Sequence, residues 1–221
     1  MPDIMNPGAK HIACVLLVDT STSMSGASID ELNEGLRAFG EALMSDAQAS
    51  GAADVCVINF NTEVTVEVSF SPAADYVAPT LSAGGLTALN EAIITGLDAI
   101  EQQKATYRQL GVDYYKPWLF LLTDGSATDT EFDADAHQRL AEALANRKVN
   151  FFPMGIGADA DIQALKSYTA NGNGAVLKAE KNHFKEAFVW LSSSMAVAST
   201  SVPGQNKVDL PETPPCMTIE L

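Results

Sequence analysis

Two kinds of hydrophobic pattern alternate along this chain. Short continuous apolar runs, such as residues 12–18, are typical of strands buried on both faces, whereas apolar residues spaced three and four apart, as in residues 28–44, predict helices with one apolar stripe. Strands separated by helices predict an α/β fold, a doubly wound and mostly parallel sheet with helices on both faces. The predicted strands are residues 12–18, 54–60, 64–70, 118–123, 149–156 and 174–178, and the predicted helices are residues 28–44, 87–102, 131–147, 159–169 and 182–197.

The strand predicted at residues 64–70 has a different pattern from the others. Valine and phenylalanine alternate there with threonine, glutamate and serine, so one face of the strand is apolar and the other is polar. Such alternation is typical of an antiparallel strand near the edge of a sheet. The other strands are expected to be parallel, and parallel sheets of this kind bind ligands beyond the carboxyl ends of their strands.

The chain is long enough for one large domain with flanking segments. It has 221 residues, and 47% of them are hydrophobic, which is ample for one core. Prolines gather near the C-terminus. We therefore predict an N-terminal segment at residues 1–10, one domain at residues 11–200, and an extended Pro-rich tail at residues 201–221.

Composition narrows the classes of partner. The net charge of −15, from 28 acidic and 13 basic residues, disfavours binding to nucleic acids and to anionic membranes. Cys14 and Cys56 lie in apolar runs and form no C-x-x-C pair, which suits a reducing compartment. Residues 1–10 lack the apolar stretch of a signal peptide, and residues 12–18 are too few to span a bilayer. We therefore expect a cytoplasmic protein.

Candidate chemistry lies where two predicted strands end. Asp19, Ser21 and Ser23 follow the first strand at alternate positions, so their side chains would share one side of an extended loop. Asp124 follows the strand at residues 118–123. Two carboxylates in one crevice need a cation between them or a proton on one of them. Carboxylates and hydroxyls are hard oxygen donors, which suit Mg²⁺ or Mn²⁺ and also allow Ca²⁺, but do not suit zinc or copper.

Each of these signals has an ordinary structural reading when it is taken alone. Serines after a strand often form a turn, Thr87 could simply begin a helix, and Asp124 followed by Gly125 is a common turn. Their combination, with each residue at a predicted strand end or helix start, is harder to explain by chance. The combination therefore favours a metal site.

The combination resembles the metal-ion-dependent adhesion site of von Willebrand factor A domains. The matching positions are Asp19-x-Ser21-x-Ser23, then Thr87, then Asp124. The resemblance covers roughly residues 12–197, and short bacterial members associated with tellurium resistance and stress responses look closest. It implies a six-stranded sheet in the order 3-2-1-4-5-6 with the third strand antiparallel.

The resemblance also implies roles for these residues. Ser21 and Ser23 would bind the metal directly, Thr87 directly or through a water, and Asp19 and Asp124 mainly through waters. A Glu or Asp of a partner protein would complete the coordination. No catalytic residue is implied, and the oligomeric state is not readable from the sequence. The expected contact rim is Ser25, Gly26, Gly85, Leu86 and Ser126.

Two other functions are alternatives to metal-dependent protein binding. A Mg²⁺-dependent phosphatase of the haloacid dehalogenase type needs a second Asp two residues after the first, and Ser21 stands there instead. A structural domain with a non-functional metal site is the other alternative.

Several residues outside these motifs have simpler interpretations. His11, His137 and His183 are scattered and are interpreted as packing or surface residues. An acidic cluster at residues 129–135 precedes a predicted helix, whose N-terminal dipole it would stabilise, although its nearness to Asp124 could affect the choice of partner.

Overall fold

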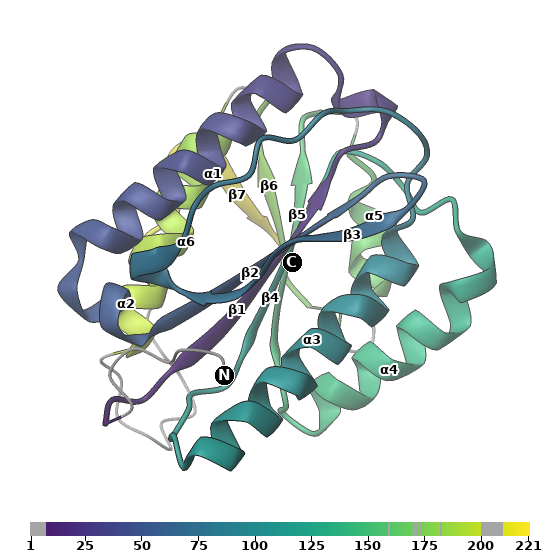
Figure 1. The fold of residues 1–221 in the computed structure, drawn as a ribbon. Coiled ribbons are helices and arrows are strands. Elements are labelled where there is room, and N and C mark those ends of the chain that lie inside the picture. Colours follow the sequence, from purple (N-terminus) through teal and green to yellow (C-terminus); the bar gives the residue numbers. More distant parts are fainter. Residues whose placement is uncertain (1–7, 159, 170–171, 173, 182, 200–209) are drawn as a thin grey trace.

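The computed structural model describes residues 8–158, 160–169, 172, 174–181, 183–199 and 210–221. Most of the predicted N-terminal segment, residues 1–7, the last residue of the predicted domain, residue 200, and the first nine residues of the predicted tail, residues 201–209, lie outside the described residues. The described chain forms an α/β fold in which helices pack on both faces of one central sheet (Figure 1). The predicted fold class is therefore confirmed.

The sheet has β1 near its centre and antiparallel strands at both edges. The order is β3-β2-β1-β4-β5-β6-β7. The predicted order of the first six strands is confirmed, as is the antiparallel pairing of β3 with β2. The strands are β1 (Ile12–Asp19), β2 (Ala53–Phe60), β3 (Val64–Pro72), β4 (Trp118–Thr123), β5 (Asn150–Ile156), β6 (Val176–Ala179) and β7 (Met217–Glu220).

The helices divide between the two faces of the sheet. Figure 1 shows α1, α2 and α6 on one face and α3 and α4 on the other. The helices are α1 (Ala27–Ser45), α2 (Ala47–Ala52), α3 (Leu89–Leu110), α4 (Asp133–Ala145), α5 (Ile162–Ser167) and α6 (Phe184–Ser199), and the short 3₁₀ turns are η1 (Thr22–Met24), η2 (Ala73–Asp75) and η3 (Thr130–Phe132).

The continuous apolar run of β1 is explained by this layering. All eight residues of β1 are buried, and successive side chains point to opposite faces of the sheet. Leu16 belongs to the hydrophobic cluster that includes Leu36 of α1 and Phe188 of α6, whereas Leu17 belongs to the cluster that includes Ile93 of α3. Helices on both faces therefore favour apolar residues at every position of the central strand up to Val18, and only its last residue, Asp19, is charged.

The strand β7 was not predicted. Met217–Glu220 pairs antiparallel with β6, so the expected count of six strands was wrong by one. The residues before β7 are also attached to the domain, since the Trp190 indole donates a hydrogen bond to the Pro211 carbonyl at 3.0 Å. Apolar and polar residues alternate in Met217–Glu220, but a run of four residues after several prolines is too short to predict a strand. Its pairing covers the edge that β6 would otherwise present.

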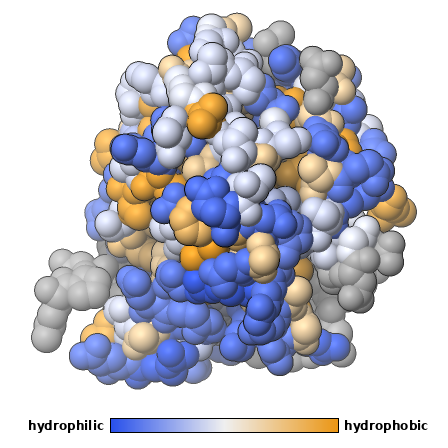
Figure 2. Space-filling model, turned by 90° about the vertical axis from the view of Figure 1, so that its right-hand side faces the viewer, coloured by the Kyte–Doolittle hydropathy of each residue, from blue (hydrophilic) through white to orange (hydrophobic). Residues whose placement is uncertain are grey.

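The outward surface of the helices is mixed in character. Figure 2 shows the side of the molecule that carries α3 and α4, where hydrophilic residues predominate and hydrophobic residues are scattered between them. Along the parts of the chain that the structure describes, no helix combines the length and the hydrophobicity that a membrane span requires.

A buried polar cluster joins the amino ends of β1 and β2 to α3. The exposed fraction of His11 is 1%, and its Nδ1 lies 2.8 Å from Oδ2 of Asp54. The Tyr107 hydroxyl donates to the same carboxylate oxygen at 2.5 Å, and burial, followed by the charge of Asp54, raises the pKa of Tyr107. His11 is therefore a buried, hydrogen-bonded packing residue rather than an isolated one.

We expect Tyr107→Phe to lower the free energy of unfolding by about 1–3 kcal/mol, because the buried Asp54 carboxylate loses a hydrogen-bond donor. Urea unfolding at neutral pH measures this change. Tyr114→Phe is the matched control, since the Tyr114 hydroxyl bonds only to the exposed Arg108 in the described contacts and its loss should cost less than about 0.5 kcal/mol. Equal stability of Tyr107→Phe and the wild type would contradict this role of the cluster.

Candidate metal centre

Asp19 is a carboxylate buried at the carboxyl end of the central strand. Its side chain accepts hydrogen bonds from the Ser21 amide at 2.8 Å and from the Thr123 hydroxyl at 2.5 Å. Burial raises the pKa of Asp19, and these hydrogen bonds oppose that rise. A buried carboxylate with a raised pKa gains from a nearby cation, because the cation replaces the solvation that burial removed.

Ser21 and Ser23 bring two hydroxyls to the same place. Their Oγ atoms lie 2.9 Å apart, and the Ser23 hydroxyl donates to Oδ1 of Asp124 at 2.6 Å. The loop is not extended as predicted, since Thr22–Met24 forms the 3₁₀ turn η1. The tight turn keeps the two hydroxyls adjacent even though the backbone is curled. Ser21 is buried and Ser23 is exposed, so the site faces solvent on the side of Ser23.

Thr87 reaches the site from a third loop. The helix was predicted to begin at Thr87, but α3 begins at Leu89, so Thr87 lies in the loop that precedes the helix. Its side chain points toward the loop after β4, because its Oγ1 is 4.0 Å from the position that a Cβ would occupy at Gly125. The structure therefore brings Thr87 beside the residue that follows Asp124.

Gly85 joins the Thr87 loop to the serine turn. The Gly85 carbonyl accepts hydrogen bonds from the Thr22 amide at 3.1 Å and from the Thr22 hydroxyl at 2.8 Å. Gly85 has a φ of +83°, and a Cβ there would lie 2.4 Å from Oγ1 of Thr62. Both observations require glycine at this position. Gly85 thus allows a close approach between loops that a side chain would prevent.

The assembled donors suit a hard divalent cation. Three loops supply three hydroxyls and two carboxylates, which are the oxygen ligands that Mg²⁺, Mn²⁺ and Ca²⁺ accept. Within the described ranges, no group of three or more His, Cys, Asp and Glu side chains is arranged to hold a metal. The described residues therefore do not form a metal site with thiolate or imidazole ligands. Neutral hydroxyls would leave a bound cation electrophilic and open to a further anionic ligand.

The match to a family model agrees with this geometry. The model of the von Willebrand factor type A domain matches residues 14–188, which include all five candidate ligands. The chain belongs to the von Willebrand factor type A (VWA) domain family. A search of curated protein sequences found no match to this chain.

Solved structures share the VWA fold with this chain. The vWF domain of the type V pili tip protein Mfa5 from Porphyromonas gingivalis has a TM-score of 0.63 and 11% identity over 90% of this chain and 99% of that chain. The pilus adhesin SpaC from Lactobacillus rhamnosus GG has a TM-score of 0.66 and 14% identity over 88% and 31%.

An archaeal structure is similar over a comparable share of this chain. The ArnB paralog VWA2 from Sulfolobus acidocaldarius has a TM-score of 0.55 and 18% identity, with 84% of this chain covered. This chain spans 45% of the length of that protein. At these identities the likeness establishes the fold alone.

The five residues of the expected contact rim are all exposed to solvent. Ser25, Gly26, Gly85 and Ser126 are exposed, and Leu86 is 60% exposed although it is apolar. Gly85 and Leu86 immediately precede the candidate ligand Thr87 in sequence. An exposed leucine next to an ion site would add apolar contact area to any partner bound there.

Sequence reasoning missed Thr123, which donates a hydrogen bond to the buried Asp19 carboxylate. Its only signal was its position immediately before Asp124. It also missed Asn90, whose side chain donates a hydrogen bond to Asp129 at the start of α3.

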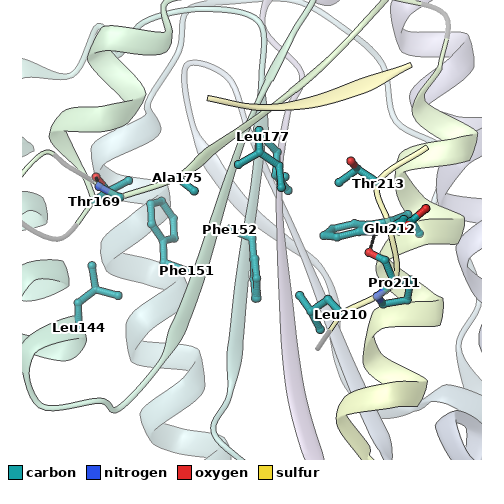
Figure 3. Close-up of a pocket in the computed structure, with 13 residues that line it drawn as sticks. Leu144, Phe151, Phe152, Thr169, Ala175, Leu177, Leu210, Pro211, Glu212 and Thr213 are labelled. Atoms are coloured by element: carbon teal, nitrogen blue, oxygen red, sulfur yellow. Dashed lines mark hydrogen bonds between the residues drawn. The ribbon is translucent and has the colours of Figure 1, made fainter. Parts of the chain in front are cut away.

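A separate apolar pocket lies away from the candidate ligands. It has a volume of about 730 Å³ and lies between β5, β6, α6 and the described part of the tail (Figure 3). Phe151, Phe152, Leu177 and Trp190 contribute to its lining, and none of the five candidate ligands does. The pocket and the candidate metal centre are therefore different places on the molecule.

Proposed function

We propose that this VWA domain binds an acidic residue of a partner protein through a Mg²⁺ or Mn²⁺ ion, with Ca²⁺ as a further candidate. One observation supports the proposal most directly: the Ser21 and Ser23 hydroxyls lie 2.9 Å apart, and the Ser23 hydroxyl donates a hydrogen bond of 2.6 Å to Asp124, which is 101 residues away in sequence. The buried Asp19 carboxylate lies beside them, with the Ser21 amide hydrogen-bonded to it.

The proposed roles follow from the position of each oxygen. The hydroxyls of Ser21 and Ser23 would bind the ion directly, and Thr87 would bind it directly or through a water. Asp19 and Asp124 would act mainly through waters and would balance the charge of the dication. Because two carboxylates and one dication are neutral together, a partner carboxylate would meet no net repulsion from the site itself. The ion would supply the attraction for that carboxylate.

The proposal assigns no catalytic chemistry to the site. A phosphatase of the haloacid dehalogenase type would need a second carboxylate where Ser21 stands, and the Ser21 hydroxyl is instead within hydrogen-bonding distance of Ser23. Hydroxyls and the two carboxylates around an ion offer no separate general base. Incubation with p-nitrophenyl phosphate and Mg²⁺ tests this assignment, and hydrolysis that is lost in Ser23→Ala would overturn it.

We also propose a cellular setting for the domain. The similarity of Leu121–Gly125 to short bacterial members supports a role in a stress or tellurium-resistance system. A cytoplasmic location is supported by three free cysteines, of which Cys14 and Cys56 are buried.

The proposal is tested by capturing partners on the immobilised chain in Mg²⁺ and in EDTA. We expect a defined set of proteins to be retained in Mg²⁺ only, because the ion forms part of the contact. Ser23→Ala should lose the same set, whereas Ser45→Ala, which removes an exposed hydroxyl bonded only to Ala42 in the described contacts, should retain it. Recovery of the same proteins in EDTA would contradict metal-dependent binding.

A further inference from the structure

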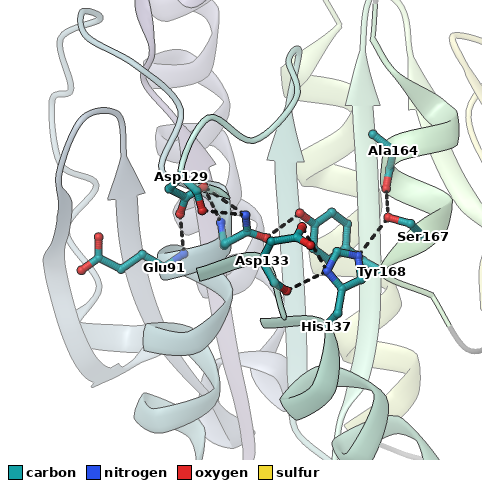
Figure 4. A network of polar contacts seen from close by, with 8 residues as sticks. Glu91, Asp129, Asp133, His137, Ala164, Ser167 and Tyr168 are labelled. Atoms are coloured by element: carbon teal, nitrogen blue, oxygen red, sulfur yellow. Dashed lines mark hydrogen bonds and ion pairs between the residues drawn. The ribbon is translucent and has the colours of Figure 1, made fainter. Parts of the chain in front are cut away.

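Asp129 caps a helix that is distant from it in sequence. Its carboxylate accepts hydrogen bonds from the backbone amides of Asn90 at 3.2 Å and Glu91 at 2.8 Å, in the first turn of α3 (Figure 4). The Asn90 side chain also donates to Asp129, to its carboxylate at 3.2 Å and to its carbonyl at 3.1 Å. The acidic cluster at residues 129–135 is therefore divided: Asp133 and Asp135 lie in the first turn of the following helix α4, as predicted, whereas Asp129 stabilises the start of α3.

Thr128, which immediately precedes Asp129, extends this connection to Thr87. The Thr87 amide donates to the Thr128 hydroxyl at 3.0 Å, and the Thr128 amide donates to the Thr87 carbonyl at 2.9 Å. Thr128 and Asp129 belong to the same loop as Asp124. Two adjacent residues thus join the backbone around one candidate ligand, Thr87, to the loop that carries another.

The start of α3 is also supported from the side of α4 and α5. The Tyr168 hydroxyl donates to the Asn90 side chain at 2.6 Å, and the Tyr168 ring stacks on His137 with centroids 4.2 Å apart. His137 in turn lies 3.1 Å from the Ser167 hydroxyl. Figure 4 shows Asp129 and Tyr168 converging on the same turn of α3 from opposite sides.

We propose that Asp129 is a positioning residue of the candidate ion site, which keeps the first turn of α3, and with it Thr87, in place relative to Asp124. This inference rests on the proposed function. Asp129 is only 8% exposed, and both of its carboxylate oxygens accept backbone amides. An asparagine could accept at one oxygen only, and its amide group would face the second backbone N–H. The first turn of α3 would then be free to shift away from the site.

The test measures Mn²⁺ affinity by titration calorimetry on the full chain carrying Asp129→Asn. We expect about 10-fold weaker binding, the size of effect typical when a residue that orients a metal ligand is removed. Asp46→Asn is the matched control, because the Asp46 carboxylate accepts a backbone amide at the start of α2 at 2.9 Å and none of the candidate ligands lies near it in sequence. We expect its Mn²⁺ affinity to stay within about 2-fold of the wild type.

Mn²⁺ affinity separates positioning from simple loss of stability. A cap removed from either helix lowers thermal stability in EDTA, but a variant that is fully folded at the assay temperature keeps its affinity unless the site itself has changed. Wild-type affinity in Asp129→Asn would overturn the inference and leave the proposed function standing. Absence of Mn²⁺ binding by the wild type would overturn both. If Asp129→Asn does not fold, Thr128→Val replaces it, with several-fold weaker binding expected and unchanged binding as the contrary result.

Discussion

Replacing Asp19 with asparagine should abolish metal binding and at the same time stabilise the metal-free protein. Asp19 is fully buried and its pKa is raised above the ordinary value of 3.8, chiefly by burial. Folding therefore favours the protonated carboxyl. Its contribution to stability is present below the ordinary pKa and is lost as the pH rises through the raised pKa. Above the ordinary pKa the buried carboxyl therefore destabilises the metal-free fold relative to the unfolded chain, and a neutral asparagine removes that cost.

Thermal unfolding with EDTA and with Mn²⁺ measures both effects. At a Mn²⁺ concentration of about 100 times the dissociation constant, the wild type should gain about 2.7 kcal/mol, whereas Asp19→Asn should gain almost nothing. In EDTA the variant should be more stable than the wild type at pH 7, and this difference should disappear below pH 3.8, the ordinary pKa of the carboxyl. The exposed Asp30 provides the control variant Asp30→Asn, which should respond to Mn²⁺ as the wild type does.

Stabilisation of Asp19→Asn by Mn²⁺ to the same extent as the wild type would contradict the metal site. A variant that is less stable than the wild type in EDTA at pH 7 would instead show that the hydrogen bonds from Ser21 and Thr123 outweigh the cost of the buried charge.

Replacing Phe188 with alanine should lower the free energy of unfolding by about 3–5 kcal/mol, the range for a large aromatic side chain removed from a core. Phe188 is fully buried in α6, and its ring lies 5.9 Å from that of Phe39 and 6.3 Å from that of Phe120, centroid to centroid. It also lies against Gly35, where a Cβ would be 2.6 Å from its Cδ2. The cavity would open between α1, α6 and the sheet.

Urea unfolding in EDTA, followed by circular dichroism, measures this loss without a contribution from metal. Val189→Ala is the control, since Val189 follows Phe188 in the same helix and is 38% exposed. It should change stability by less than about 0.5 kcal/mol. A comparable loss in both variants would contradict the role of core packing at Phe188, and helix propensity could not explain it, because alanine favours the helix more than phenylalanine or valine does.

Much of the fold followed from local patterns. The continuous apolar run at residues 12–18 predicted a strand buried on both faces, and the alternation at residues 64–70 predicted the antiparallel strand, because each pattern reports how many faces of a strand are covered. Element ends were less predictable. Thr87 was assigned to a helix that begins at Leu89, since the first turn of α3 takes its cap from Asp129, 38 residues after Glu91.

The sequence by itself determined which strands are central, and it singled out Asp19, Ser21, Ser23, Thr87 and Asp124 as a set of oxygen donors. Only the tertiary structure decided that Thr87 lies beside Gly125, that Asp129 caps α3 rather than α4, and that Met217–Glu220 closes the edge of the sheet. Periodicity and residue type reflect local conformational preference and burial, so these two properties can be read from the sequence. The partner of a helix cap or of an edge strand depends on which distant segments packing brings together, and no local pattern encodes that.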